Sequence, residues 1–151
     1  MWYSAGSASG KALGYATSSD GITWTHNPSP ILTAGPAGSW DSAGVYHPFV
    51  IHRTSNYEMW YAGLGYAASV LYIKIGYANS SDGITWTKYS GNPVLDVGPP
   101  GDWDDRYVFA RTVYMSSLTI LSSSSLFSFP LFMSRRTSFF VFISSGPTTI
   151  A

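Results

Sequence analysis

Three polar side chains are candidates for chemistry because they interrupt an internal repeat of the chain. His47, Asp105 and Arg106 stand at positions whose repeat equivalents are alanine or serine. A residue that serves a site is expected to be unique to one repeat, whereas a packing residue recurs. Arg106 could hold a carboxylate in place or donate to a hydroxyl group of a ligand, and His47 could hydrogen-bond a substrate or lie in a sheet with its hydrogen bonds satisfied. We expect these residues, with Tyr46 beside His47, to bind substrate.

Two aspartates do recur, each directly after a tryptophan. Asp41 follows Trp40, and Asp104 follows Trp103 at the equivalent place. Such a carboxylate could take part in acid–base chemistry, or it could accept hydrogen bonds from backbone donors in a turn. Recurrence favours the turn role, yet Asp41, Asp104 and Asp105 are retained as candidates for catalysis. Trp40 and Trp103 are expected to pack between units first and to bind sugars by stacking second.

These residues are positioned by two repeats of about sixty residues. Gly14–Thr25 returns as Gly76–Thr87 with a single difference, and Met1–Tyr3 returns as Met59–Tyr61. A repeat of this length predicts units that need neighbours to bury their faces. Because Met1 aligns with a residue inside the second repeat, we expect the chain to be a fragment of a longer protein.

Each unit is predicted to contain four strands and no helix. In the second unit the expected strands are Val45–His52, Tyr57–Gly63, Leu71–Asn79 and Ile84–Tyr89. Asp82-Gly83 joins the last two, and Asp-Gly between strand segments predicts a tight turn. Four-stranded units at regular spacing indicate a β-propeller. The predicted fold class is therefore all-β, a propeller fragment built from four-stranded antiparallel blades.

The expected organisation is a partial β-propeller over residues 1–114. It comprises an incomplete blade and connector (1–44), a complete blade (45–90), and a connector with the first strand of the next blade (91–114). Residues 115–151 differ sharply, with eleven serines and no acidic residue. A shifted reading frame is the favoured explanation for this Ser/Phe-rich tail, and a disordered low-complexity tail or a membrane anchor are the alternatives.

The overall composition excludes several classes of partner. Eight basic and eight acidic residues give a formal net charge of zero, which argues against nucleic acid or an anionic membrane as a partner. The chain has no cysteine and its three histidines lack the spacing of metal ligands. We expect no cofactor and no metal. The residues after Met1 show no signal-peptide pattern, and the localisation stays open.

The repeat resembles the five-bladed propeller glycosidases, the superfamily of arabinanases, β-xylosidases and invertases that includes family 43 glycoside hydrolases and related phosphorylases. The resemblance covers residues 1–114. The segments that carry it are Ile75–Ala78, Ser81–Ile84 with Trp86, Asn92–Leu95, Gly38–Asp41, Val45–Ile51 and Met59–Gly63.

This resemblance implies an active site on the propeller axis, with carboxylates at the starts of the innermost strands. One carboxyl group would act as general acid and another as base or nucleophile. Where the family pattern carries Asp-Pro, this chain has His47-Pro48. The carboxylate expected at that strand is therefore absent.

The predicted function is that of a fragment of a carbohydrate-active propeller, of the glycoside hydrolase or phosphorylase type, which acts on or binds glycans. Two blades cannot enclose an axial site, so the isolated chain is expected to be inactive. A non-catalytic carbohydrate-binding or structural propeller module is the alternative. Open blade edges also predict self-association.

Overall fold

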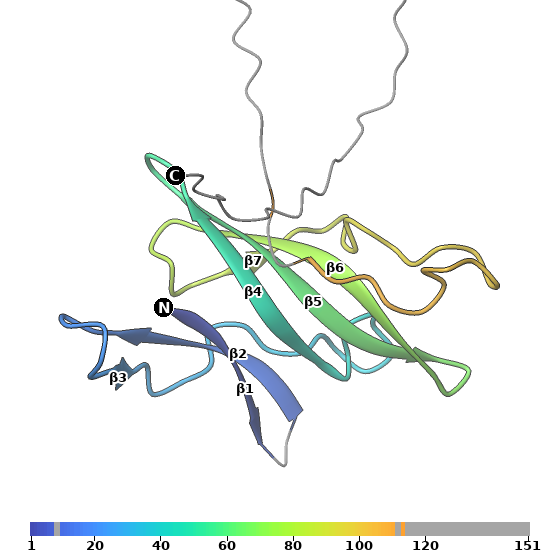
Figure 1. Ribbon diagram of the computed structural model, residues 1–151, viewed down its shortest axis with the longest axis horizontal. Coiled ribbons are helices and arrows are strands. Elements are labelled where there is room, and N and C mark those ends of the chain that lie inside the picture. Colours follow the sequence, from blue (N-terminus) through green and yellow to red (C-terminus); the bar gives the residue numbers. More distant parts are fainter. Residues whose placement is uncertain (8–9, 111–112, 114–151) are drawn as a thin grey trace, which may run out of the picture. The chain divides into compact units, whose positions relative to one another are not determined.

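The computed structural model describes residues 1–7, 10–110 and 113, nearly all of them in a compact unit, Met1–Arg111 (Figure 1). Within the described residues the secondary structure consists of strands, with no helix. The predicted tail, 115–151, lies outside these residues. The predicted first strand of the next blade, within 91–114, is described only in part, and Tyr107 makes a parallel bridge to Ile73 there.

The complete blade contains four consecutive antiparallel strands, as the repeat predicts. They are β4 (Gly44–His52), β5 (Tyr57–Ala67), β6 (Val70–Ser80) and β7 (Thr87–Lys88). Strand β5 pairs with β6 along its whole length, from Tyr57↔Ser80 to Ala67↔Val70. The all-β propeller class is thereby confirmed.

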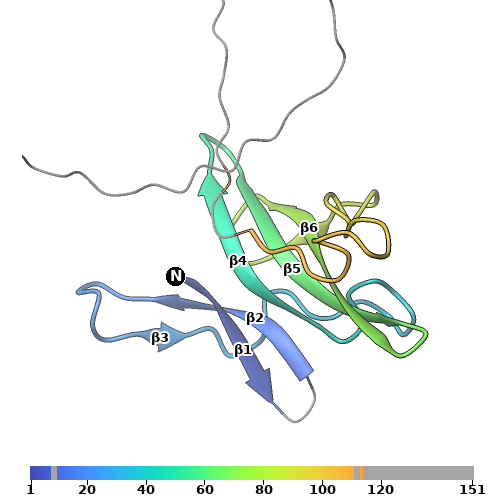
Figure 2. The same ribbon diagram turned by 45° about the vertical axis from the view of Figure 1, so that its right-hand side comes forward.

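The first blade repeats three of these strands. They are β1 (Trp2–Ser7), β2 (Gly10–Thr17) and β3 (Thr25–His26), which correspond to β5, β6 and β7. The pairing of β2 with β3 through Ala16↔His26 matches that of β6 with β7 through Ala78↔Lys88. Figures 1 and 2 show β1 and β2 beside β4, and a parallel bridge, Lys11↔Gly44, joins the two blades.

The outermost strand β7 is shorter than the predicted Ile84–Tyr89 because side chains hold the preceding turn. The Asp82 carboxylate accepts from the backbone N–H of Ile84 at 2.8 Å and of Thr85 at 2.7 Å. These N–H groups, that of Thr85 first, hold the pKa of Asp82 well below its usual range. Gly83 has φ 76°, the left-handed conformation that the Asp-Gly pair predicts. The turn therefore extends through Ile84 and Thr85, and the ladder begins after it.

A shared hydrophobic core joins the two blades. It combines Leu13 of β2, Val45 of β4 and Met59 of β5, all fully buried. Ile31 and Leu32 reach it from the connector between the blades, and the backbone of Leu32 bridges to Leu13. Burial of side chains this size contributes about 2 kcal/mol each. The connector between the two blades is thus packed against the sheet at Ile31 and Leu32, before β4 begins.

Candidate functional site

The start of β4 carries a backbone irregularity at the histidine that the repeat singles out. Pro48 has no N–H to give to the ladder, and the pairing of β4 with β5 is interrupted between Tyr46 and Phe49. His47 takes φ 51°, and its N–H donates to the Ser4 hydroxyl at 2.8 Å. A non-glycine residue in this conformation costs about 1–3 kcal/mol, and such residues concentrate at functional sites.

Four side chains meet at this bulge, and we call them the inner-strand cluster: Lys11, Tyr46, His47 and Phe109. The ring of Tyr46 lies 4.5 Å from that of His47 and 6.3 Å from that of Phe109, edge to face in both cases. The Lys11 ammonium lies 5.3 Å from the centre of the Tyr46 ring. His47 and Lys11 are exposed, and Phe109 is 54% exposed. The cluster therefore offers aromatic surface and a cation to solvent.

The pairing of distant segments brings the cluster together. Lys11 of β2 lies beside Gly44 through the parallel bridge between the blades. In the second repeat Tyr107 lies in the same way beside Ile73, and the N–H of Ile73 donates to the carbonyl of Arg106 at 3.0 Å. This places Phe109, two residues further on, against Tyr46. The cluster thus unites residues from the first blade, the second blade and the segment after it.

The chemistry of the cluster is that of binding. Burial, and then the nearby Tyr107, raise the pKa of Tyr46 to about 12, so its hydroxyl stays protonated at neutral pH. Aromatic faces accept the apolar face of a sugar ring, while the phenol, imidazole and ammonium groups can hydrogen-bond hydroxyls. The four residues include no carboxylate. The arrangement can hold a sugar but supplies no carboxylic acid–base pair of its own.

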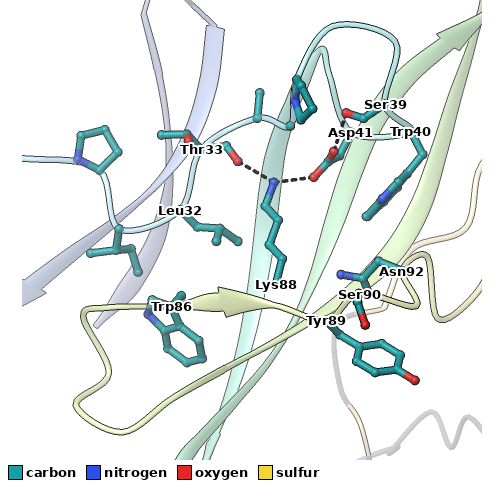
Figure 3. A pocket seen from close by; sticks show the side chains of 15 residues that line it. Leu32, Thr33, Ser39, Trp40, Asp41, Trp86, Lys88, Tyr89, Ser90 and Asn92 are labelled. Atoms are coloured by element: carbon teal, nitrogen blue, oxygen red, sulfur yellow. Dashed lines mark hydrogen bonds and ion pairs between the residues drawn. The ribbon is translucent and has the colours of Figure 1, made fainter.

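Two of the residues singled out in the sequence lie away from this cluster, in the packing between the blades. Asp41 is 2% exposed, and its carboxylate accepts from Lys88 at 2.6 Å and from the Ser39 hydroxyl at 2.9 Å (Figure 3). Trp40 packs on Tyr61 with ring centres 5.9 Å apart. These contacts indicate that Asp41 and Trp40 serve to pack the two blades together.

Beside this ion pair lies a cavity of about 560 Å³ between the connector and the residues after Thr85. Figure 3 shows Lys88 extended across it, donating to the Thr33 carbonyl at 2.8 Å as well as to Asp41. Trp86 and Tyr89 also line it. The carboxylate beside this cavity, Asp41, has an equivalent in the second repeat. A residue that recurs is expected to pack blades together, so we interpret the cavity as part of the junction between blades and not as a binding site.

The remaining residues singled out in the sequence lie in the connector that follows the second blade. The Asp105 carboxylate accepts from the N–H of Gly101 at 2.8 Å, and the Asp104 carbonyl accepts from that of Gly98 at 3.1 Å. Arg106 is exposed, close in sequence to the cluster residue Phe109. Trp103 is 96% exposed. These residues lie close in sequence, and the contacts of both aspartates are with their own turn.

Sequence reasoning missed Lys11 and Phe109. The signal for Lys11 was present, because its repeat equivalent is Ile73, and a charge that replaces an apolar residue is as unusual as His47. Phe109 carried no such signal, since its equivalent is the aromatic Tyr46. Only the pairing of its segment with β6 shows where it lies.

The part of the chain that the structure describes offers neither a metal site nor a membrane-spanning helix. Those residues contain no group of three or more histidine, aspartate or glutamate side chains able to hold a metal ion. They also contain no helix long and apolar enough to cross a membrane.

The curated proteins that are similar to this chain include the following two. The uncharacterized protein Rv1502 of Mycobacterium tuberculosis is 28% identical over 115 residues, which cover 72% of this chain and 36% of that protein. The A type blood N-acetyl-α-D-galactosamine deacetylase of Flavonifractor plautii is 28% identical over 107 residues, which cover 64% of this chain and 13% of that protein. The chain thus spans about a third, or less, of the length of these relatives.

A solved structure and a protein family that match this chain both agree with the all-β fold described above. The solved structure of a BT0996 RGII complex superposes with a TM-score of 0.51 at 25% identity, over 60% of this chain and 29% of the matched protein. The family model of β-1,4-mannooligosaccharide phosphorylase matches residues 1–97. The resemblance to propeller glycosidases and phosphorylases is thereby confirmed. Because the match covers more than half of its residues, this chain belongs to the glycoside hydrolase 130 family, that of β-1,4-mannooligosaccharide phosphorylase.

Proposed function

We propose that this chain forms a sugar-binding part of a propeller enzyme of the glycoside hydrolase or phosphorylase type, and that the inner-strand cluster is where it holds the sugar. The observation that carries the proposal is the strained His47 beside Tyr46, at the start of an innermost strand. Strain retained next to exposed aromatic and cationic side chains is typical of a binding site. Family membership supports a β-1,4-linked mannooligosaccharide as the ligand to test.

Catalysis by the isolated chain is not expected. Hydrolysis of a glycosidic bond needs a carboxyl group on each side of the bond, and phosphorolysis, in which phosphate is the nucleophile, still needs an acid to protonate the leaving oxygen. The cluster contains no carboxyl group. Asp41 is committed to Lys88, and Asp105 to the backbone of its own turn. We therefore expect the chain to bind mannooligosaccharide without cleaving it, in the presence or absence of inorganic phosphate.

A second candidate, a non-catalytic carbohydrate-binding propeller, is favoured by a specific observation. His47-Pro48 stands where the family pattern carries Asp-Pro, so the innermost strand of the complete blade presents an imidazole instead of a carboxylate. The two candidates differ in the carboxylates of the other blades. They share the prediction that the inner-strand cluster binds sugar.

Replacing Tyr46 with alanine should weaken the binding of β-1,4-mannooligosaccharides about tenfold, because the central ring of the cluster is lost. Isothermal titration calorimetry measures the change. Tyr89→Ala is the control, since Tyr89 is an aromatic residue, 54% exposed, that lines the junction cavity and lies outside the cluster. Loss of binding in Tyr89→Ala, with Tyr46→Ala unaffected, would move the sugar site to that cavity. Release of sugar by the purified chain would contradict the absence of catalysis.

A further inference from the structure

At the junction between the two blades, two neighbouring residues of the connector pack on the sheet of the second blade. The indole of Trp40, in the connector, packs on Tyr61 of β5. Glycines make room for it, since a Cβ at Gly63 would lie 2.3 Å, and one at Gly76 2.7 Å, from the ring. Beside the indole, Asp41 accepts from Lys88 of β7 at 2.6 Å. A Trp-Asp pair from one connector thus docks on the sheet of the following blade.

The same Trp-Asp pair follows the second blade, and no strand of the described residues packs against it there. Trp103 and Asp104 correspond to Trp40 and Asp41, and Trp103 is 96% exposed. The turn that presents them is already formed. The N–H of Gly98 donates to the Asp104 carbonyl at 3.1 Å, as that of Gly35 donates to the Asp41 carbonyl at 3.3 Å. An indole this exposed, on a preformed turn, is typical of an interface side chain.

The receiving surface also occurs a second time, on the first blade. Tyr3 pairs with Gly14 in the register in which Tyr61 pairs with Gly76. His26, at the position of Lys88, is exposed, and its ring nitrogen lies 2.9 Å from the Tyr3 hydroxyl. In the described part of the chain no tryptophan packs on Tyr3, whose ring contact there is with His26. Among the described residues, both halves of the junction are therefore present without the other half against them.

We propose that copies of this chain associate head to tail, with Trp103 and Asp104 of one copy docked on the Tyr3–Gly14–His26 surface of the next. The internal junction supports the arrangement, because Asp104 would face the imidazole of His26 as Asp41 faces the ammonium of Lys88, and an imidazole N–H can donate to a carboxylate. The two surfaces are different patches, so the interface is heterologous. It would repeat between copies a contact that the chain already makes within itself.

One residue of the receiving surface differs from the internal junction, and it provides a sharp test. Ala5 stands at the position of Gly63, where a Cβ would lie 2.3 Å from the docked indole. The methyl group of Ala5 must hold the indole of the neighbouring copy away from its closest position. Ala5→Gly removes this obstacle and should tighten association about tenfold, in line with the cost of overpacking. A role of Ala5 confined to its own strand predicts no such gain.

Sedimentation velocity over a concentration series tests the proposal on the full chain. The average mass of the wild type should rise with concentration, and Trp103→Ala should remain monomeric. Tyr66→Ala is the matched control, because Tyr66 is an aromatic residue 62% exposed on a different hairpin, and it should associate like the wild type. A wild type that is monomeric at its highest soluble concentration, or a Trp103→Ala variant that still associates, would overturn the proposal.

A mixing experiment tests the head-to-tail geometry. Ala5→Arg blocks the receiving surface but leaves Trp103, whereas Trp103→Ala leaves the receiving surface. Each variant alone should be monomeric, and an equimolar mixture should give a species of twice the monomer mass and nothing larger. A mixture that stays monomeric, while the wild type associates, would exclude this pair of surfaces. Circular dichroism of each variant confirms that the strands are retained.

Discussion

Replacing Trp40 with alanine is expected to lower the free energy of unfolding by about 3 kcal/mol, whereas the same change at Trp103 should alter it by less than about 0.5 kcal/mol. The two tryptophans occupy equivalent positions of the repeat and differ in what covers them. Trp40 packs on Tyr61 and the core, while Trp103 is 96% exposed. Removal of the first leaves a cavity over Gly63 and Gly76, and removal of the second leaves none.

Urea unfolding at low protein concentration, followed by circular dichroism, measures both variants. Low concentration matters because it keeps copies of the chain apart, so the result reports the fold of a single chain. Equal losses at Trp40 and Trp103 would contradict the account, since they would mean that the second tryptophan also packs within its own chain. A negligible loss at Trp40 would show that the blade junction adds little stability.

Replacing Lys88 with methionine is expected to cost about 3 kcal/mol, because it leaves the Asp41 carboxylate buried without its cation. The side chain of Asp41 is 3% exposed and lies 2.6 Å from the Lys88 ammonium. Lys74→Met is the matched control. Lys74 pairs with Asp96 at 2.8 Å, but that carboxylate is 56% exposed, so the control should lose less than about 1 kcal/mol.

A double variant separates the net contribution of the Asp41–Lys88 ion pair to stability from the cost of removing only one of its two charges. Asp41→Leu combined with Lys88→Met replaces both charges by apolar groups and should recover most of the stability lost in Lys88→Met. Thermal unfolding of the single and double variants closes the cycle. A double variant no more stable than Lys88→Met would show that Asp41 contributes mainly through Ser39 and its own turn.

The strands of the complete blade were predictable because their signals are local. The apolar segment at Val45–His52 and the alternation at Tyr57–Gly63 correspond to β4 and β5. The repeated tryptophan at position 40 was expected to pack first, and it does. The shortening of β7 was not predicted, because it depends on a carboxylate, Asp82, that binds the backbone ahead of the ladder.

The candidate site was predictable only in part, because it depends on contacts between distant segments. Tyr46 and His47 were identified from one strand start, and the structure places both in the cluster. Lys11 and Phe109 join them through bridges that connect residues about thirty positions apart. No local pattern specifies these pairings. The φ of His47 is likewise a tertiary effect, since a residue before proline ordinarily takes an extended conformation.

Nuclear magnetic resonance titration of the ¹⁵N-labelled chain with a β-1,4-mannooligosaccharide tests the central claim most directly. If the inner-strand cluster binds the sugar, the shifted amide signals will come from Lys11, Gly44–His47 and Tyr107–Phe109, and the signals of Trp86–Ser90 will stay in place. Shifts confined to Trp86–Ser90 would place the sugar in the junction cavity. A spectrum that does not change at saturating sugar would contradict the proposal that these blades contact carbohydrate.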